Sequence, residues 1–302
     1  MSITAVAGPA EDAGYEIERE RGALVVALPS VMADVMSLVR EHGTLYDAAA
    51  AQPDAQSFTG RGAAYRMSLA REDCVVRHYR RGGAVARVLH DEYLRTGEPR
   101  PLRELHASIA ARSRGVDTPE VLTAIMYLAG PLYRADLATR FVRGSRDLAT
   151  VTFGADNLTR EASPESAPER AAAWHAAGLL LRTAFAAGVE HADLNLRNIL
   201  ITGPAADAGS GSGVAAGGRP RAGGDAGAGP GAGAGAGAER TTRALLLDLD
   251  RATVREEPVS GAARSSMLAR LHRSREKLEK QTGVKTGEDA LAAFEAGLRG
   301  RG

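Results

Sequence analysis

The stretch that most strongly decides the fold reads His191-Ala-Asp-Leu-Asn-Leu-Arg-Asn198 and continues directly into the apolar run Ile199-Leu-Ile201. A short apolar run that follows a polar segment predicts a buried strand preceded by a loop. On that loop Asp193 can position and deprotonate an alcohol, while Asn198 offers an amide oxygen of the kind that binds Mg²⁺. We predict that His191 bonds the loop backbone and does not transfer protons. The alternative is a polar loop whose Asp and Asn only satisfy the backbone of a turn.

A second apolar run, Arg243-Ala-Leu-Leu-Leu-Asp248, also ends in an aspartate and continues as Leu249-Asp250. An aspartate that closes a strand downstream of such a loop occupies the place of the metal-binding Asp in the kinase DFG motif. The spacing of Asp193 and Asn198 is also that of the kinase catalytic loop. We therefore predict Asp193 as the catalytic base and Asn198 and Asp248 as ligands of Mg²⁺.

The segment 203–238, which separates these two runs, is a low-complexity sequence of mostly Gly and Ala (GPAADAGSGSGVAAGGRPRAGGDAGAGPGAGAGAGA). It has almost no bulky apolar side chain, so burial cannot offset the entropy that the segment would lose on ordering. Lengthening a loop adds little to the entropic cost of closing it. We therefore predict that the two runs pair as a hairpin and that 203–238 is a flexible surface insertion.

Two glycines between strand-like segments mark a candidate loop for the phosphates of ATP, formed by Gly60, Arg61, Gly62 and Ala63. Glycine lets backbone amides approach phosphate oxygens closely, although an ordinary hairpin turn has the same composition. Kinases also place a lysine on the strand that follows this loop. The three lysines of this chain all lie from residue 277 onward, so another residue must take that role.

Arg77 on the predicted strand 74–79 is the candidate for the missing lysine, with Glu104 on the predicted helix 99–114 as its partner. Arginine is always charged and can bind phosphate or carboxylate through two nitrogens, although its geometry differs from that of lysine. The alternatives are a surface arginine and a solvated glutamate.

The overall charge is nearly balanced, because 38 basic and 37 acidic side chains leave a formal net charge of +1. That balance excludes a globally basic nucleic-acid binder, and we expect no nucleic-acid partner. The single cysteine, Cys74, excludes an internal disulfide and a cysteine-based zinc site, which favours a reducing cytoplasm. No apolar run has the length of a membrane span, and the first residues lack the pattern of a signal peptide. We expect a soluble intracellular protein that contacts a membrane only peripherally.

The remaining periodicity predicts an α+β protein in which strands dominate the first part and helices the second. The predicted strands are 23–28, 63–69, 74–79, 121–128 and 136–142, with a turn at 71–73. The predicted helices are 30–41 with Ser30 as its cap, 99–114, 167–187 and 260–281. We expect a strand-rich N-terminal lobe over 1–143 and a helical C-terminal lobe over 144–302, with the nucleotide between them.

These motifs together resemble the lipopolysaccharide kinase family, and most closely its 3-deoxy-D-manno-octulosonic acid (Kdo) kinases. The similarity runs through GRGAAY (60–65), VVRHYRRGG (75–83), DEY (91–93), REL (103–105), YRADLATR (133–140), RDL (146–148), HADLNLRNIL (191–200) and LLLDLDR (245–251). The family itself uses arginine on the strand that carries Arg77, and DFD-like residues at the metal site, where Leu249 here replaces the usual Phe. The resemblance implies a bilobal protein kinase-like fold with a short helical C-lobe.

The resemblance also implies an activity, namely the ATP- and Mg²⁺-dependent phosphorylation of the 4-hydroxyl of a Kdo sugar on a lipid A precursor. Such an enzyme would work at the cytoplasmic face of the inner membrane of a Gram-negative bacterium. Basic side chains at 77–81 and on the helix 260–281 would suit an anionic glycolipid, unless that helix simply exposes a solvated basic face. A heptose kinase or a RIO-like protein kinase of the same superfamily is the alternative among enzymes, and a nucleotide-binding pseudokinase is the alternative without catalysis.

Overall fold

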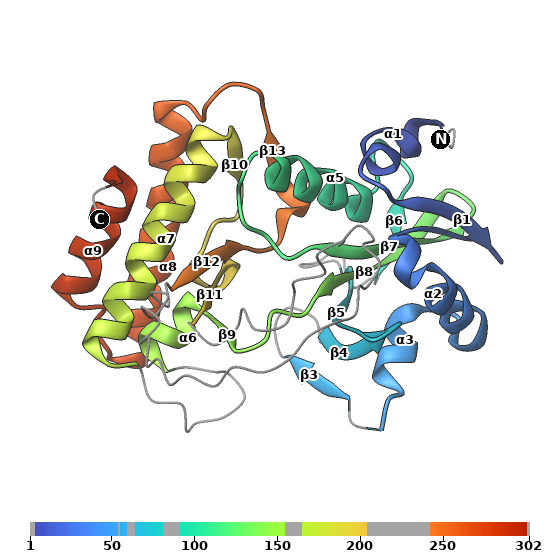
Figure 1. The fold of residues 1–302 in the computed structure, drawn as a ribbon, viewed down its shortest axis with the longest axis horizontal. Helices are drawn as coiled ribbons and strands as arrows, with labels where there is room; N and C mark the ends of the chain where they lie inside the picture. Colours follow the sequence, from blue (N-terminus) through green and yellow to red (C-terminus); the bar gives the residue numbers. More distant parts are fainter. Residues whose placement is uncertain are drawn as a thin grey trace, which may run out of the picture.

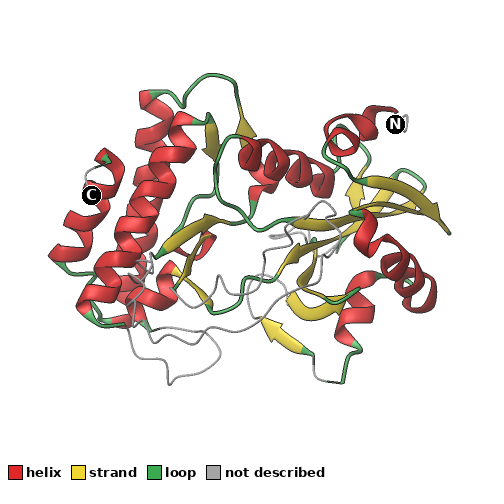
Figure 2. Ribbon diagram, viewed as in Figure 1, coloured by secondary structure: helices red, strands yellow, loops and turns green. Residues whose placement is uncertain are grey.

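The computed structural model describes residues 4–53, 55–58, 64–80, 91–154, 165–203 and 242–300. The candidate phosphate loop of Gly60, Arg61, Gly62 and Ala63 lies outside these described residues, and so does 204–238 of the predicted insertion. The described part combines a large antiparallel sheet with helices, which confirms the α+β class. Most strands gather at one end of the molecule and the longest helices at the other (Figure 2).

Eight strands of the described residues form one antiparallel sheet in the order β1-β2-β7-β8-β5-β4-β3, with β6 paired to β8 (Figure 1). They are β1 (Glu16–Glu20), β2 (Ala23–Ala27), β3 (Gln56–Phe58), β4 (Ala64–Leu69), β5 (Glu72–His78), β6 (Tyr93–Leu94), β7 (Val121–Ala129) and β8 (Leu132–Arg140). Every residue of β2 is buried, as is most of β7, because helices cover both faces of the sheet at its centre. The edge strand β1 is instead highly charged and largely exposed.

Four helices of the described residues cover this sheet, two on each face (Figure 1). They are α1 (Thr4–Asp12), α2 (Pro29–His42), α3 (Leu45–Ala50) and α5 (Arg100–Ser113). Helices α2 and α3 share a buried apolar core with one face, and α1 and α5 share a second core with the other.

The residues after β8 form the helical part together with two small sheets. Its elements are β9 (Ser145–Asp147), α6 (Leu148–Phe153), α7 (Ala167–Ala186), β10 (Val189–His191), the 3-10 turn η1 (Leu196–Asn198), β11 (Ile199–Thr202), β12 (Arg243–Leu246), the 3-10 turn η2 (Leu249–Arg251), β13 (Ala252–Val254), α8 (Gly261–Thr282) and α9 (Glu288–Arg299). The predicted hairpin is present, because β11 pairs antiparallel with β12. Trp174, Leu181 and Phe294 are fully buried in the core of this part. Within the described ranges, no helix has both the length and the hydrophobicity that crossing a bilayer requires.

Two glycines let helices α7 and α9 cross in close contact. A Cβ atom on Gly178 would lie 2.3 Å from the carbonyl oxygen of Phe294, and one on Gly297 would lie 2.3 Å from that of His175. No side chain fits at such a distance from a backbone atom, so both positions require glycine. Gly178, which lowers the helix propensity of α7, is therefore explained by packing.

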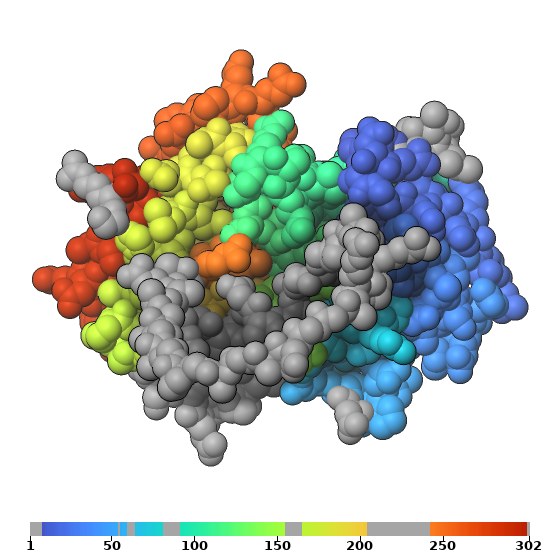
Figure 3. Space-filling model, in the orientation of Figure 1, coloured from blue at the N-terminus to red at the C-terminus, as the bar shows by residue number. Residues whose placement is uncertain are grey.

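Helix α5 lies between the sheet and the helical part (Figure 3). Leu102 near its start belongs to the core under the sheet, whereas Ala111 near its end belongs to the core of the helical part. Immediately after the helix, Arg114 donates hydrogen bonds to the carbonyl oxygens of Ala187, at 3.0 Å, and of Arg255. The helix thus packs on both parts at once.

The turn between β4 and β5 is tighter than the predicted turn at 71–73. Ala70 and Arg71 both have positive φ angles, of 48° and 76°, as in a two-residue type I′ hairpin turn. Leu69 and Glu72 therefore pair directly, and β5 begins two residues earlier than predicted. The prediction missed this turn because neither residue is the glycine or asparagine that usually adopts positive φ.

Two further boundaries differ from the prediction. Strand β8 begins at Leu132, earlier than predicted, because residues 130–131 form a tight turn and Leu132 pairs at once with Ala129. The predicted cap at Ser30 is wrong, since α2 begins at Pro29 and its N-cap position makes no side-chain hydrogen bond. Proline has the φ angle of a first helical residue, which explains the earlier start. The other predicted strands and helices are present, with ends that differ by one or two residues.

Candidate active site

The predicted catalytic loop runs from the end of β10 to the start of β11, and His191 fixes its shape. The buried His191 ring accepts a hydrogen bond at Nδ1 from the backbone N–H of Asp193 (3.2 Å) and donates from Nε2 to the carbonyl oxygen of Leu247 (2.9 Å). This pattern of bonds requires the neutral tautomer with its proton on Nε2. His191 thus joins the loop to the segment after β12, as predicted for a structural histidine.

Two asparagines brace the same loop. Asn195 accepts a hydrogen bond from the backbone N–H of Arg197 and donates one to the carbonyl oxygen of Asp193, each over 2.9 Å. The amide nitrogen of Asn198 donates to the same carbonyl oxygen over 3.1 Å. These bonds hold the backbone of Asp193 and do not use its carboxylate.

The β11–β12 hairpin brings Asn198 and Asp248 to the same end. Ile199 lies opposite Leu246, and the backbone N–H of Leu247 donates to the carbonyl oxygen of Asn198 (2.9 Å). Asp248 follows with φ 61° and ψ 57°, a left-handed conformation that costs a residue other than glycine about 1–2 kcal/mol. Backbone strain of this kind concentrates at functional sites.

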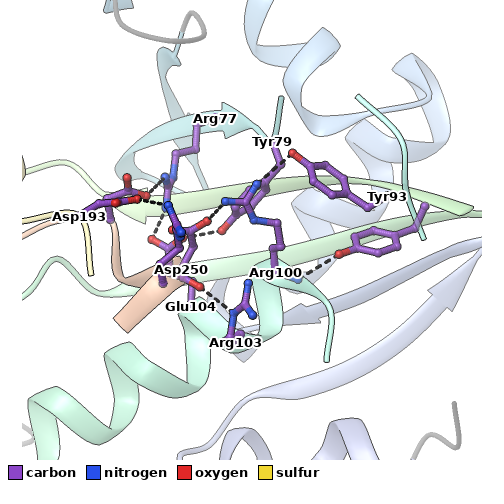
Figure 4. A network of polar contacts seen from close by, with 11 residues as sticks. Arg77, Tyr79, Tyr93, Arg100, Arg103, Glu104, Asp193 and Asp250 are labelled. Atoms are coloured by element: carbon purple, nitrogen blue, oxygen red, sulfur yellow. Dashed lines mark hydrogen bonds and ion pairs between the residues drawn. The ribbon is translucent and has the colours of Figure 1, made fainter. Parts of the chain in front are cut away.

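Arg77 connects β5 to both α5 and this hairpin. Its guanidinium forms an ion pair with Oε1 of the buried Glu104 and donates from Nη1 to Oδ1 of Asp248 (2.9 Å). Tyr79, two residues further and therefore on the same face of the extended chain, donates its hydroxyl to Oε2 of Glu104 (2.5 Å; Figure 4). The expected Arg77–Glu104 pair is therefore present, and Asp248 is a second partner of the arginine.

The charge of Arg77 controls the ionisation of Asp248. Burial raises the pKa of the Asp248 carboxyl, but the charge and hydrogen bond of Arg77, together with more distant positive groups, lower that pKa below its usual range. At Glu104 burial is the stronger influence and raises the pKa, although Arg77 opposes the shift. Asp248 is consequently an anion at neutral pH, which is the state that a metal ligand requires.

The oxygen atoms at this end of the hairpin are of the types that bind Mg²⁺. Within the described residues, Oδ2 of Asp248 and Oδ1 of Asn198 have no hydrogen-bond partner. No cluster of three or more His, Cys, Asp or Glu side chains suited to a metal occurs in that same part of the chain. Mg²⁺ is commonly held by one or two carboxylates, with water and substrate phosphates completing its coordination. The two oxygens therefore fit the ion in type, and their role as ligands stays a prediction.

Sequence reasoning missed a second set of contacts, which fastens α5 to η2 (Figure 4). The buried Asp250 forms an ion pair with Arg100, and its carbonyl oxygen accepts a hydrogen bond from Nε of Arg103 (2.7 Å). Arg100 also donates to the hydroxyl of Tyr93 (3.1 Å). The sequence held one indication that Arg100 faces the site. Arg100 and Glu104 are four residues apart and so share a face of the helix.

The candidate base, Asp193, pairs with another residue that the prediction did not consider. Nη1 of Arg251 donates to Oδ2 of Asp193 over 2.6 Å. Both side chains are about half exposed, 57% for Arg251 and 47% for Asp193. Arg251 directly follows Asp250 at the end of η2, and no spacing rule connects it with a loop so far away in the sequence.

Comparison with known proteins agrees with the motifs. The model of the lipopolysaccharide kinase (Kdo/WaaP) family matches residues 52–211. A protein of Xanthomonas campestris pv. campestris (strain B100), named 3-deoxy-D-manno-octulosonic acid kinase, is 30% identical over 238 residues. That match covers 78% of this chain and 74% of the relative.

Two other relatives with the same name match a shorter region. The protein of Stenotrophomonas maltophilia (strain R551-3) is 34% identical over 146 residues, which are 48% of this chain and 53% of the relative. The protein of Vibrio cholerae serotype O1 (strain ATCC 39315 / El Tor Inaba N16961) is 32% identical over 147 residues, which are 48% of this chain and 57% of the relative. The match thus spans little more than half the length of these two relatives. A solved structure described as WaaP in complex with acyl carrier protein has a TM-score of 0.46 and 17% identity, over 87% of this chain and 86% of that one.

Proposed function

This chain belongs to the lipopolysaccharide kinase (Kdo/WaaP) family, and we propose that it is a Kdo kinase. It would transfer the γ-phosphoryl group of ATP to the 4-hydroxyl of a Kdo sugar on a lipid A precursor. The observation that carries this proposal is the position of Arg77, which contacts both Glu104 on α5 and Asp248 after β12. A protein kinase needs the ion pair between its phosphate-binding cation and a helix carboxylate to be in place together with its metal-binding aspartate.

Asp193 is the proposed base, on the loop that His191 and the two asparagines hold. The sugar hydroxyl oxygen attacks the γ-phosphorus while the hydroxyl proton passes to the Asp193 carboxylate. The bond between the γ-phosphorus and the β–γ bridging oxygen breaks, and ADP leaves with the electron pair. Because the backbone of Asp193 is already fixed, only its side chain has to adjust to meet the hydroxyl.

The phosphates of ATP would meet positive charge from Arg77, whose alignment depends on Glu104 and Tyr79. Backbone amides of Gly60, Arg61, Gly62 and Ala63 would cover the phosphates. Asn198 and Asp248 would hold Mg²⁺, which when bound supplies positive charge at the β- and γ-phosphates.

The acceptor would be an anionic glycolipid, and contact with the cytoplasmic face of the inner membrane of a Gram-negative bacterium would follow from it. Helix α8 supports this part of the proposal, because Arg273, Lys277 and Lys280 are exposed on its surface. Basic side chains near a membrane are attracted to anionic lipid headgroups. No nucleic-acid partner is proposed.

A transfer assay tests the proposal. The full chain is incubated with γ-labelled ATP, Mg²⁺ and one of three acceptors, namely a Kdo-bearing lipid A precursor, a heptosylated core or a generic protein, and the products are identified by mass spectrometry. Phosphate on the Kdo 4-hydroxyl is the expected result. Transfer only to heptose or to protein would instead identify one of the related kinases, and nucleotide binding without any transfer would identify a pseudokinase.

The variant Asp193→Asn tests the base. We expect transfer to fall about 10²- to 10⁴-fold while nucleotide affinity is kept, because a general base contributes on that scale. The matched control Asp289→Asn removes an exposed aspartate of α9 and should leave transfer unchanged. Full turnover in Asp193→Asn would refute the role of Asp193.

A further inference from the structure

The guanidinium of Arg251 is bonded to the Asp193 carboxylate that the proposed reaction needs. The proposed base Asp193 must accept the hydroxyl proton, yet its Oδ2 receives a hydrogen bond from Nη1 of Arg251 over 2.6 Å. Arginine stays charged at every pH that the protein experiences, so this partner does not leave by losing its proton. An acceptor hydroxyl must therefore compete with a guanidinium for the same carboxylate.

The Arg251–Asp193 pair can exchange partners at little cost in free energy. Both side chains are about half exposed, and ion pairs of exposed side chains contribute only about 0–1 kcal/mol. The residues before Arg251 are in contrast firmly fixed, because Leu249 and Asp250 are buried and Asp250 is bound by Arg100. The guanidinium of Arg251 can therefore change partners while the residues before it stay fixed. It lies directly beside the place where the acceptor hydroxyl has to lie.

The chemistry of the acceptor indicates which partner replaces Asp193. The relatives are named for 3-deoxy-D-manno-octulosonic acid, an acid sugar, so their substrate carries a carboxylate close to its hydroxyl groups. A guanidinium binds a carboxylate through two parallel hydrogen bonds, which is stronger and more specific than a single one. Among the described residues Arg251 pairs with no acidic side chain other than Asp193, so a substrate anion has no other competitor there.

We propose that Arg251 is the residue that selects an acid sugar as acceptor. On binding, the sugar carboxylate takes the Arg251 guanidinium away from Asp193, and Asp193 is thereby freed to receive the hydroxyl proton. This inference rests on the proposed kinase function. The inference also explains why a neutral sugar would react slowly. A neutral sugar cannot draw Arg251 away, so Arg251 stays bonded to Asp193.

The test compares two acceptors and three variants. The acceptors are the Kdo-bearing lipid A precursor and the same molecule with its sugar carboxylate converted to a neutral carboxamide. The variants are Arg251→Gln, the conservative Arg251→Lys and the control Arg255→Gln, which removes an exposed arginine on the same segment. For each protein, kcat and KM for phosphate transfer are measured, together with equilibrium binding of both acceptors.

The expected result is a change of preference. Arg251→Gln should lower kcat/KM for the acid acceptor about 10- to 100-fold, the scale of a lost hydrogen bond to a charged group. The same variant should leave turnover of the carboxamide unchanged or higher, because Asp193 is then free. Arg251→Lys should restore part of the preference for the acid, and Arg255→Gln should behave like the wild type.

Other outcomes overturn the inference. An equal loss on both acceptors would mean that Arg251 acts on the transferred phosphoryl group or on folding. A loss that follows removal of the lipid A phosphates, and not conversion of the sugar carboxylate, would assign the residue to phosphate. If the wild type phosphorylates neither acceptor, the proposed function fails, and the binding data still decide the inference. In that case, acid-selective binding that Arg251→Gln abolishes would support it, and equal binding of both acceptors would refute it.

Discussion

Two arginine–aspartate pairs lie on neighbouring residues of η2 and differ in almost every physical respect. The side chain of Asp250 is 6% exposed and that of its partner Arg100 is 28% exposed, whereas Asp193 and Arg251 are 47% and 57% exposed. A buried pair is costly to separate, because each charge loses the other without gaining water. An exposed pair separates at almost no cost. The chain thus has a fixed contact and an exchangeable contact within two residues.

Helix α5 carries a second fixed contact of the same type, between Glu104 and Arg77. Glu104 and Asp250 are alike in being buried carboxylates that each pair with a partly exposed arginine, and both pairs use the first turns of the same helix. The following variants distinguish fixed contacts from exchangeable ones, and they are given from the largest expected effect to the smallest.

Arg77→Met should have the largest effect. It leaves the buried Glu104 without its counter-charge, and removing one partner of a buried pair costs about 3–5 kcal/mol. We expect the free energy of unfolding, measured by chemical denaturation, to fall by about 3 kcal/mol, and nucleotide affinity to fall with it. The double variant Arg77→Met/Glu104→Gln should recover part of the stability but none of the affinity. Unaltered nucleotide binding in Arg77→Met would remove the arginine from the nucleotide site.

Asp250→Asn should have the second largest effect. We expect the free energy of unfolding to fall by about 2 kcal/mol, the scale of a hydrogen bond to a charged group. Arg103 keeps its bond to the Asp250 carbonyl oxygen, so the loss is smaller than at Arg77. Hydrogen exchange at the start of α5 should increase in this variant, while the control Asp289→Asn should leave exchange unchanged. Equal protection of α5 in both variants would show that Asp250 does not fasten the helix.

The contacts of one histidine with two carboxylates can be broken by pH instead of mutation. His78 on β5 bonds Asp136 (2.6 Å) and Asp91 (2.8 Å), and although burial opposes its charge, these carboxylates raise its pKa above 6.5. Stability from a charged His78 is therefore fully present below pH 6.5 and is lost as pH rises through the higher value of the folded state. Unfolding free energies measured between pH 5.5 and 9 should fall with pH in the wild type relative to His78→Gln. Parallel curves would mean that folding leaves the pKa of His78 unchanged.

Arg251→Ala should have the smallest effect on stability, below about 0.5 kcal/mol, because its pair is exposed. The measurement is the midpoint of thermal unfolding, which should coincide with that of Arg255→Ala. A clear loss of stability in Arg251→Ala alone would make the pair a structural contact, and the contrast with Asp250 would disappear.

The fold could be predicted where burial leaves a pattern in the sequence. Strands β2 and β7 are covered on both faces and therefore read as continuous apolar runs. Strand β1 was not predicted, because an edge strand can be built from charged residues and then resembles a loop. The type I′ turn at Ala70 and Arg71 was missed for a related reason, since the rest of the hairpin imposes a conformation that these residues do not prefer.

The candidate site could be predicted where its residues belong to one motif. Asp193, Asn198 and Asp248 stand in local patterns with known spacing, and Arg77 was identified because no lysine precedes residue 277. Arg100 and Asp250 are 150 residues apart, and no local pattern links two residues at that separation. Contacts of this kind depend on how α5 packs, which only the folded structure reveals.

Helix α5 has a consequence for how the molecule loses its structure. Leu102 and Leu105 are buried with the sheet, while Ala107 and Ala111 are buried with the helical part. Melting either part alone would strip one side of this helix and expose the apolar surface of the other core. We therefore expect the two halves to unfold together, and a chain cut after residue 115 would yield two fragments of which neither keeps a complete interior.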